Sequence, residues 1–482
     1  MKNSKLKFTT LPLLSLLALT LLLTACTTET PDTTEPGPRP PTTQEQTAWV
    51  PNDDLTEQQL IFMYDLNYML YILENNFAVM DVAHWAYGLD IHQVVNSIRQ
   101  EVIQNPDMDV DDFFVTLSRE LTSSGLIGFL NTLNPIMHSN WLTGNAPGIF
   151  RQDNVMEFYR PRHPEEPEDD YARAYRILTT HGEGSILHFA RRLEIVSGET
   201  DLAADILRAR DEGDIYLATS LAAEAFHLTA DAPAIHTEII EDGRIAYLGI
   251  NWFDLNRRID VHNFYQEIRG FEHLIVDIRA VETGDPRFFF DVIMRPNLRN
   301  DVTINGFGFA TSGEYMQNVL NPLRLGREIF FFDTYEFGDA ADIVANHDLP
   351  ELALWDIERM TYGFRLEKTL TPDHIGGRPA FNGKIWLLTG PGTIWGAQLA
   401  TWVSRASEFA THVGEPSGGN FGGGVRSFAA LPLTGILIHF EPLYITDEQG
   451  WPLEAGTAPH HLNYPGLNAL ETVLVLIDEG RY

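Results

Sequence analysis

The chain has a single cysteine and little positive charge. With Cys26 alone among 482 residues, no disulfide framework can form, so the fold must rely on packing. Lysine and arginine number 33 against 67 aspartates and glutamates, a formal net charge of −34. Nucleic-acid binding requires a basic surface, so this balance excludes a nucleic-acid partner. The apolar share of 44% is ordinary for a globular protein, and the length predicts two or more domains.

The N-terminus carries a targeting segment. Three lysines within the first seven residues precede the apolar residues 8–25, a run that is short for a membrane-spanning helix of about 20 residues. The segment ends in LTAC (23–26), which resembles the lipobox of bacterial lipoproteins. This resemblance implies that residues 1–25 are a cleaved signal peptide and that Cys26 is lipidated. We therefore expect an extracytoplasmic protein, anchored by its lipid to the bacterial membrane on the cell-surface or periplasmic side.

Three further regions differ in their residue patterns. Residues 26–48, rich in threonine and proline, have no apolar period and predict an extended tether. Residues 49–237 repeat apolar positions at spacings of three and four, which predicts a mainly α-helical N-terminal domain. In residues 238–482 short β-branched runs alternate with helical stretches, which predicts an α/β domain. The clearest of these runs are RIAYLGI (244–250), HLIVDI (273–278) and KIWLLT (384–389).

The second half of the chain resembles the tail-specific (C-terminal-processing) serine peptidases. Five segments match in family order: IEDGRIAYLGINWF (240–253), FEHLIVDIRA (271–280), GKIWLLTGPGTIWGAQLATW (383–402), GEPSGGN (414–420) and the closing residues 450–478. The helical residues 75–90 resemble the N-terminal region of some members, and no convincing PDZ segment is recognisable. The resemblance implies an α/β fold with a crotonase-like (ClpP-type) core of stacked β-β-α units, preceded by the mainly α-helical N-terminal domain.

The reactive groups of this family are replaced. These peptidases attack an amide with a serine hydroxyl, and a lysine or, in another branch, a histidine takes its proton. The family motif Thr-x-Ser-Ala-x-Glu falls on residues 393–398, with Trp395 at the serine and Gln398 at the glutamate. The lysine, expected twenty-five residues after the serine, corresponds to Asn420. The histidine of the other branch corresponds best to Leu126.

The same resemblance points to the residues around the expected cleft. The oxyanion-side pattern after the Asp-x-Arg strand retains one glycine at best, Gly284. Ser417 matches a threonine that is normally structural, and Asp277 and Arg279 are expected to form a buried pair. The candidates for the cleft or for ligand contact are Trp395, Gln398, Gly284, Gly392 and Ser417. We interpret Trp395 as filling the emptied cleft, with stacking on a ligand as the alternative.

Other reactive side chains have plainer interpretations. Ser404 and Ser407 are interpreted as ordinary serines of the helix that follows Trp395. His460 and His461 are adjacent without a third ligand nearby, so we interpret them as surface residues. We therefore expect no metal and no cofactor.

A retained scaffold without its reactive groups predicts a catalytically inactive relative. We expect a lipoprotein that binds peptide or unfolded polypeptide, or that serves as a scaffold. One alternative is an active serine-type endopeptidase with a displaced nucleophile, which a serine or lysine close to Trp395 would favour. Another is a solute-binding lipoprotein whose resemblance is only architectural, which a deep cleft between two similar lobes would favour.

Overall fold

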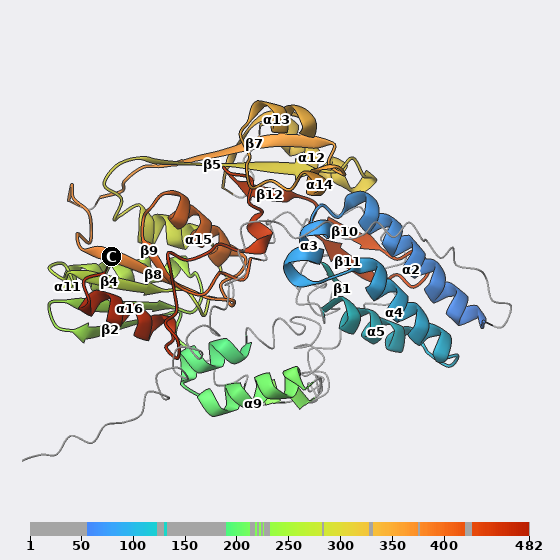
Figure 1. The fold of residues 1–482 in the computed structure, drawn as a ribbon, viewed down its shortest axis with the longest axis horizontal. Helices are drawn as coiled ribbons and strands as arrows, with labels where there is room; N and C mark the ends of the chain where they lie inside the picture. Colours follow the sequence, from blue (N-terminus) through green and yellow to red (C-terminus); the bar gives the residue numbers. More distant parts are fainter. Residues whose placement is uncertain are drawn as a thin grey trace, which may run out of the picture. The chain divides into compact units, whose positions relative to one another are not determined.

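The computed structural model describes a mixed α/β fold with a helical N-terminal region (Figure 1). It describes residues 55–122, 130–132, 189–212, 217–218, 221–222, 225, 232–281, 284–326, 331–374, 376–419 and 427–481. Cys26, Leu126 and Asn420 lie outside these ranges, as do the tether and the signal segment. Among the described helices, none combines the length and the apolarity that a membrane crossing requires.

The N-terminal region is built from helices that bury apolar side chains. A capping box starts the first helix, because the Thr56 hydroxyl accepts from the Gln59 N–H at 3.2 Å while the Gln59 side chain accepts from the Thr56 N–H at 2.9 Å. The labelled helices in the described part of this region are α2 (Glu57–Asn76), α3 (Met80–Tyr87), α4 (Ile91–Gln104), α5 (Val110–Thr122) and α9 (Thr200–Asp211), and residues 189–197 are also helical.

Helices α2 to α5 share one hydrophobic cluster with part of the α/β region. Phe62 of α2 stacks on Phe113 of α5 with ring centroids 4.3 Å apart. The same cluster includes Phe309, Phe440 and Tyr444, which come from the second half of the chain. Burial of this shared apolar surface stabilises the contact between the helical and the α/β parts.

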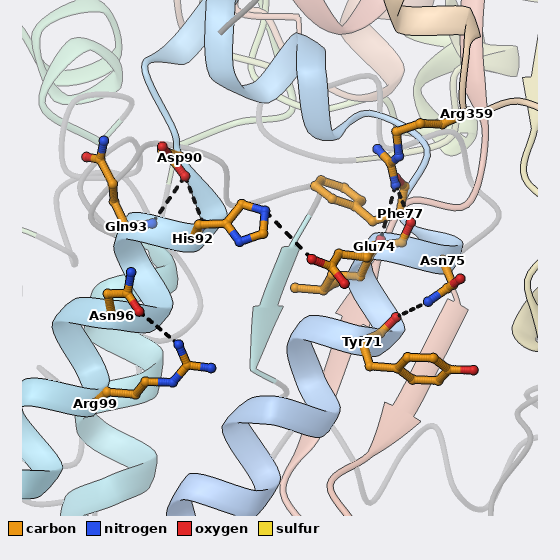
Figure 2. A network of polar contacts seen from close by, with 11 residues as sticks. Tyr71, Glu74, Asn75, Phe77, Asp90, His92, Gln93, Asn96, Arg99 and Arg359 are labelled. Atoms are coloured by element: carbon orange, nitrogen blue, oxygen red, sulfur yellow. Dashed lines mark hydrogen bonds and ion pairs between the residues drawn. The ribbon is translucent and has the colours of Figure 1, made fainter. Parts of the chain in front are cut away.

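Polar contacts fix the ends of α2 and α4 (Figure 2). The guanidinium of Arg359 donates to the carbonyl oxygens of Glu74 at 2.7 Å and of Phe77 at 3.2 Å, where α2 ends. These carbonyls have no partner within the helix, so Arg359 acts as a C-terminal cap from a distant part of the chain. Asp90 caps α4 by accepting from the backbone N–H groups of His92 and Gln93.

The largest sheet has six strands in the order β13-β9-β8-β4-β3-β2. Five of them run parallel, and β2 pairs antiparallel with β3. The strands are β2 (Ile235–Glu241), β3 (Ile245–Ile250), β4 (His273–Asp277), β8 (Lys384–Thr389), β9 (Thr411–Gly414) and β13 (His461–Leu462). Strand β2 begins three residues before the boundary at residue 238 that the sequence suggests.

Helices cover both faces of this sheet, which explains why its central strands are mainly apolar and almost wholly buried. Alternate side chains point to opposite faces: Leu387 of β8 lies in the cluster with α15 (Gly396–Ala406) and α11 (Arg258–Glu267), whereas Trp386 packs with α16 (Ala469–Asp478). Strand β8 is therefore held in register by its neighbours and by helices on either side (Figure 1).

Two smaller antiparallel sheets complete the described fold. The four-stranded sheet has the order β12-β5-β7-β6 and the three-stranded sheet the order β1-β11-β10. Their strands are β1 (Leu130–Thr132), β5 (Val302–Ala310), β6 (Asp333–Asp339), β7 (Tyr362–Leu370), β10 (Ser427–Ala430), β11 (Leu437–Phe440) and β12 (Tyr444–Asp447). The remaining helices are α12 (Gln317–Arg324), α13 (Ala340–Asn346) and α14 (Leu354–Ile357), with short helical turns at Leu255–Arg257, Phe289–Met294, Glu314–Met316 and Leu453–Ala455.

A buried carboxyl joins α14 to β12. Asp356 is 1% exposed and accepts a hydrogen bond of 2.9 Å from the Tyr444 hydroxyl. Burial raises the pKa of Asp356 to about 7, and the charge of Asp81 adds to this rise, while the Tyr444 hydrogen bond and the charge of Arg359 oppose it. The folded protein therefore favours the protonated carboxyl.

This carboxyl makes stability fall as the pH rises. An unfolded aspartate titrates near pH 3.9, so between about pH 4 and pH 7 the unfolded chain releases a proton that the folded chain retains. The contribution of Asp356 to stability is thus greatest below pH 4 and is lost as the pH rises to about 7. We expect Asp356→Asn to remove this part of the pH dependence in urea unfolding between pH 4 and pH 7.5. The exposed Glu267→Gln is the control, and an unchanged pH profile in Asp356→Asn would contradict the assignment.

Candidate active site

The turn between β8 and α15 carries the predicted nucleophile position. Strand β8 ends at Thr389 and α15 begins at Gly396, as the sequence predicts. The turn is closed by two hydrogen bonds, from the Gly390 N–H to the Thr393 hydroxyl at 3.2 Å and from the Thr393 N–H to the Gly390 carbonyl at 2.8 Å. Thr393 is fully buried, and Gly392 is buried within the same turn. Trp395 therefore lies at the junction of strand and helix.

The backbone of Trp395 is strained. Its φ of 52° and ψ of −120° are a rare conformation for a residue with a bulky side chain. Such a conformation costs on the order of 1–3 kcal/mol and persists only where its surroundings enforce it. The nucleophile of α/β-hydrolases occupies a comparable strained turn from strand to helix, which exposes its hydroxyl. Here the turn has the strained backbone, and the position that the sequence predicts for the nucleophile carries an indole.

The Gly-Glu loop after β9 packs against this turn. The Glu415 N–H donates to the Thr389 carbonyl at 3.2 Å, and the Gly418 N–H donates to the Thr393 carbonyl at 2.9 Å. A Cβ at Gly418 would lie 2.0 Å from the Pro391 oxygen, so glycine is required there. Ile394 and Gly419 form a parallel bridge. Trp395, the predicted nucleophile position, directly follows Ile394 in sequence.

Gly284, which the sequence resemblance matches to the oxyanion side, borders the first residue of α15. It pairs with Phe253 at a φ of 122°, and a Cβ there would come within 2.4 Å of the Phe253 oxygen. A Cβ on Gly396 would lie 3.7 Å from the Gly284 oxygen, so this segment borders the first residue of α15. The structure thus brings Gly284, Gly392 and Trp395 to one place.

Gln398 and Ser417 form a separate buried pair. The Ser417 hydroxyl donates to the Gln398 side-chain oxygen and accepts from the Thr457 N–H, the latter at 2.7 Å. The Gln398 amide donates to the Leu453 carbonyl at 3.1 Å and to the Thr457 hydroxyl at 3.0 Å. A serine that donates its proton to an amide oxygen has no base to activate it. These bonds fasten the Gly-Glu loop to α15, in agreement with the structural role expected for Ser417.

Asp277 and Arg279 form the buried pair that the sequence predicts. The guanidinium donates to the carboxylate at 2.7 Å and 3.0 Å, and the Tyr247 hydroxyl donates to the same carboxylate at 2.9 Å. Burial alone would lower the pKa of Arg279, but the charge of Asp277 outweighs this effect and raises it. Both charges are therefore matched, and the pair supports the end of β4 beside β8.

One nucleophile–base pair escapes sequence reasoning. The Ser404 hydroxyl lies 2.9 Å from Nε2 of His412, and both residues are fully buried. Burial lowers the pKa of His412 well below its usual value, so the imidazole is neutral. Ser404 is thus not an ordinary helix serine, because it holds a specific bond to β9. The sequence signal for this pair is a polar residue on the buried face of a helix. The position of β9 is needed to show that His412 is its partner.

The other reactive side chains make structural contacts. The Ser407 hydroxyl donates to the Val403 carbonyl at 2.6 Å, the usual bond of a serine within a helix. Nδ1 of His460 accepts from the His412 N–H at 2.9 Å, and its Nε2 contacts Arg405. Within the described ranges, no group of three or more His, Cys, Asp or Glu side chains could hold a metal ion.

Comparison with known proteins finds no matching family model and no matching curated protein. Several solved structures are similar to this chain, and three of them are described here. A candidate peptidase from Parabacteroides merdae is 12% identical, with a TM-score of 0.46 over 88% of this chain and 96% of that one. Mature CPAF complexed with lactacystin is 11% identical, with a TM-score of 0.46 over 88% and 98%. The photosystem II D1 C-terminal processing protease is 11% identical, with a TM-score of 0.36 over 88% and 97%.

One of these neighbours is described as a peptidase and another as a C-terminal processing protease, both at low sequence identity to this chain. TM-scores below 0.5 describe a partial overlap of the folds. The proposals below therefore rest on the residues of this chain.

The strain at Trp395 predicts an unusual order of variant stabilities. At a positive φ any Cβ is disfavoured by about 1–2 kcal/mol, whereas glycine is not. We expect Trp395→Gly to be more stable to urea unfolding than Trp395→Ala by about that amount. At Asn263, an exposed position within α11, the order should be the usual one, with alanine about 1 kcal/mol more stable than glycine. Equal stability of the two Trp395 variants would show that the backbone there is relaxed.

Proposed function

We propose that this protein is an extracytoplasmic, lipid-anchored lipoprotein whose tail-specific-peptidase-like domain is catalytically inactive and binds peptide or unfolded polypeptide. The observation that carries the proposal is the position of Trp395. This residue lies in a strained turn of the kind that holds a nucleophile in other hydrolases, but its indole is not a nucleophile. Loss of an activated serine costs roughly a millionfold in turnover in a well-studied serine protease. The turn keeps its shape without a nucleophile because neighbouring residues support it. These are Gly284, Gly418 and the Gln398–Ser417 pair.

The proposed core is crotonase-like, with stacked β-β-α units of the ClpP type. Its support is the order of elements: β2 and β3 lead into α11 and then β4, and β8 leads through α15 to β9. Parallel strands joined by a helical crossover are the expected building units of such a layered α/β fold.

An active peptidase with a displaced nucleophile is the less favoured alternative. Within the described ranges, the serine with a base at hydrogen-bond distance is Ser404, beside His412. Ser404 is fully buried and lies nine residues along α15 from Trp395, about 14 Å along the helix axis. A polypeptide could reach it only after α15 had separated from the sheet.

Peptidase inactivity is the first prediction of this proposal. We expect the full chain to bind a fluorescent unfolded polypeptide, measured by anisotropy, and to leave it uncleaved on gels. Trp395→Ser combined with Asn420→Lys should introduce weak cleavage, whereas neither change alone should, because nucleophile and base act as a unit.

Ser404→Ala is the matched control for the buried pair. We expect it to lower stability by about 1–3 kcal/mol, because it leaves Nε2 of the buried His412 without its hydrogen-bond partner. It should leave binding unchanged. Cleavage by the unaltered chain that disappears in Ser404→Ala would identify Ser404 as a displaced nucleophile and overturn the proposal.

Lipid anchoring is a separate prediction. A diacylated or triacylated Cys26 should hold the protein firmly to the membrane, since each buried methylene contributes about 0.8 kcal/mol. We expect Cys26→Ala to move the protein from the membrane fraction to the aqueous fraction, or to retain the unprocessed precursor. Incorporation of labelled palmitate only into the unaltered chain would support the assignment, and unlabelled protein in the cytoplasm would contradict it.

A further inference from the structure

One side of α2 is apolar and exposed to solvent. Leu60, Tyr64 and Tyr71 are 38%, 55% and 54% exposed, and their separations of four and seven residues align them along one side of the helix. Figure 2 shows the ring of Tyr71 pointing away from α4. These three residues are called the α2 face below. The proposed function assigns no role to it.

The α2 face carries no charge. Charged residues make up 21% of the chain, yet Asp65 is the only one within residues 58–73. Asp65 is fully buried, and its carboxylate accepts from the backbone N–H groups of Leu433 at 3.0 Å and Thr434 at 2.7 Å. A helix that is apolar on every side is normally buried on every side. Because one side of α2 is exposed instead, this side indicates a contact with something outside the chain.

The area of the α2 face is small, because neighbouring side chains of α2 make contacts within the protein. The Tyr68 hydroxyl lies 3.2 Å from the Tyr315 hydroxyl, and the Asn67 side-chain oxygen accepts from Arg99. Two half-exposed tyrosines and a leucine offer on the order of 300 Å², since a whole aromatic side chain buries about 150–250 Å². A stable interface buries about 800 Å² on each protein partner. The α2 face is therefore too small to hold a second copy of the chain by itself.

A membrane surface next to the lipid anchor requires much less area. Residues 27–56 separate Cys26 from Glu57, the first residue of α2, and at about 3.1 Å per residue they reach at most about 90 Å. This step rests on the proposed lipid anchor at Cys26. A flexible link of this kind gives an effective concentration of about millimolar, so that a weak contact is sufficient. Tyrosine also suits the lipid–water boundary, because its ring is apolar and its hydroxyl is polar.

We propose that the α2 face lies on the lipid bilayer that holds Cys26, with the rings of Tyr64 and Tyr71 among the lipid headgroups. The helix axis then runs along the membrane surface, and the contact orients the helical region against it. The lipid contacted is zwitterionic phospholipid. The α2 face has no cation to attract anionic lipid, and anionic lipid repels a chain with a net charge of −34.

The direct test is the quenching of a fluorescent label on α2 by lipid. The lipidated full chain is purified in detergent and reconstituted into phosphatidylcholine vesicles that contain doxyl-labelled lipid. Lipidation blocks the thiol of Cys26, the single cysteine, so Tyr64→Cys offers one thiol to the dye NBD and the unaltered chain should take up no dye. We expect at least twofold quenching at position 64. Ile259→Cys, on α11 and 69% exposed, is the matched control and should stay unquenched; equal quenching at both positions would overturn the proposal.

Sedimentation of the vesicles separates this proposal from the lipid anchor. Protein left in the supernatant would overturn the anchor, and the contact of α2 with it. Protein that sediments without quenching at position 64 would overturn the contact alone. Stronger quenching after phosphatidylglycerol replaces part of the lipid would show that cations elsewhere make the contact. NBD fluorescence that changes with protein concentration in detergent, without lipid, would identify a second copy as the occupant, and either result would overturn the proposal.

Substitutions test the tyrosines themselves, with the dye moved to Leu60→Cys. Tyr64→Asp combined with Tyr71→Asp should abolish the quenching at position 60, because a carboxylate is costly to place among lipids, and should leave sedimentation unchanged. Leu354→Asp, at an exposed apolar position of α14, is the matched control and should leave the quenching as it was. Full quenching in the double variant, with its fold verified by circular dichroism, would overturn the assignment to the α2 face.

Discussion

The pairing of β8 between β4 and β9 is the interaction on which the rest of the structure depends. Its backbone fixes the register of the parallel strands, and its alternating side chains anchor one cluster on each face of the sheet. Because β8 and α15 are held at both ends, the chain between Thr389 and Gly396 must turn sharply. That constraint sustains the positive φ of Trp395.

The contacts that shape the turn between β8 and α15 are distinct from the groups that catalysis would require. Catalysis in the peptidases that the sequence resembles requires a hydroxyl and a base, and the positions that match these groups carry Trp395 and Asn420. The contacts that support the turn are present. Asp277 pairs with Arg279, and the Ser417 hydroxyl donates a hydrogen bond to the Gln398 side chain. Such contacts stabilise the fold whether or not a reaction occurs, so their persistence is consistent with a protein that binds without cleaving.

The apolar patterns of the sequence predict the strands and helices that are determined by residues close together in the chain. KIWLLT is a short apolar run between glycines, and it forms β8 over the residues predicted; Gly396 begins α15 as expected. The apolar spacing of residues 49–237 predicts helices such as α2, but it does not predict that Arg359, which is remote in sequence, caps the end of α2. The four-stranded antiparallel sheet and the Ser404–His412 bond were missed, because both arise from partners that no periodicity reveals.

The central claim is that no activated serine exists in this protein. Its most direct measurement is the intact mass of the purified full chain after incubation with a fluorophosphonate, which reacts only with activated serine hydroxyls. The account predicts an unchanged mass under conditions that label an active serine peptidase completely. A stoichiometric mass increase, mapped to any serine of this chain, would contradict it.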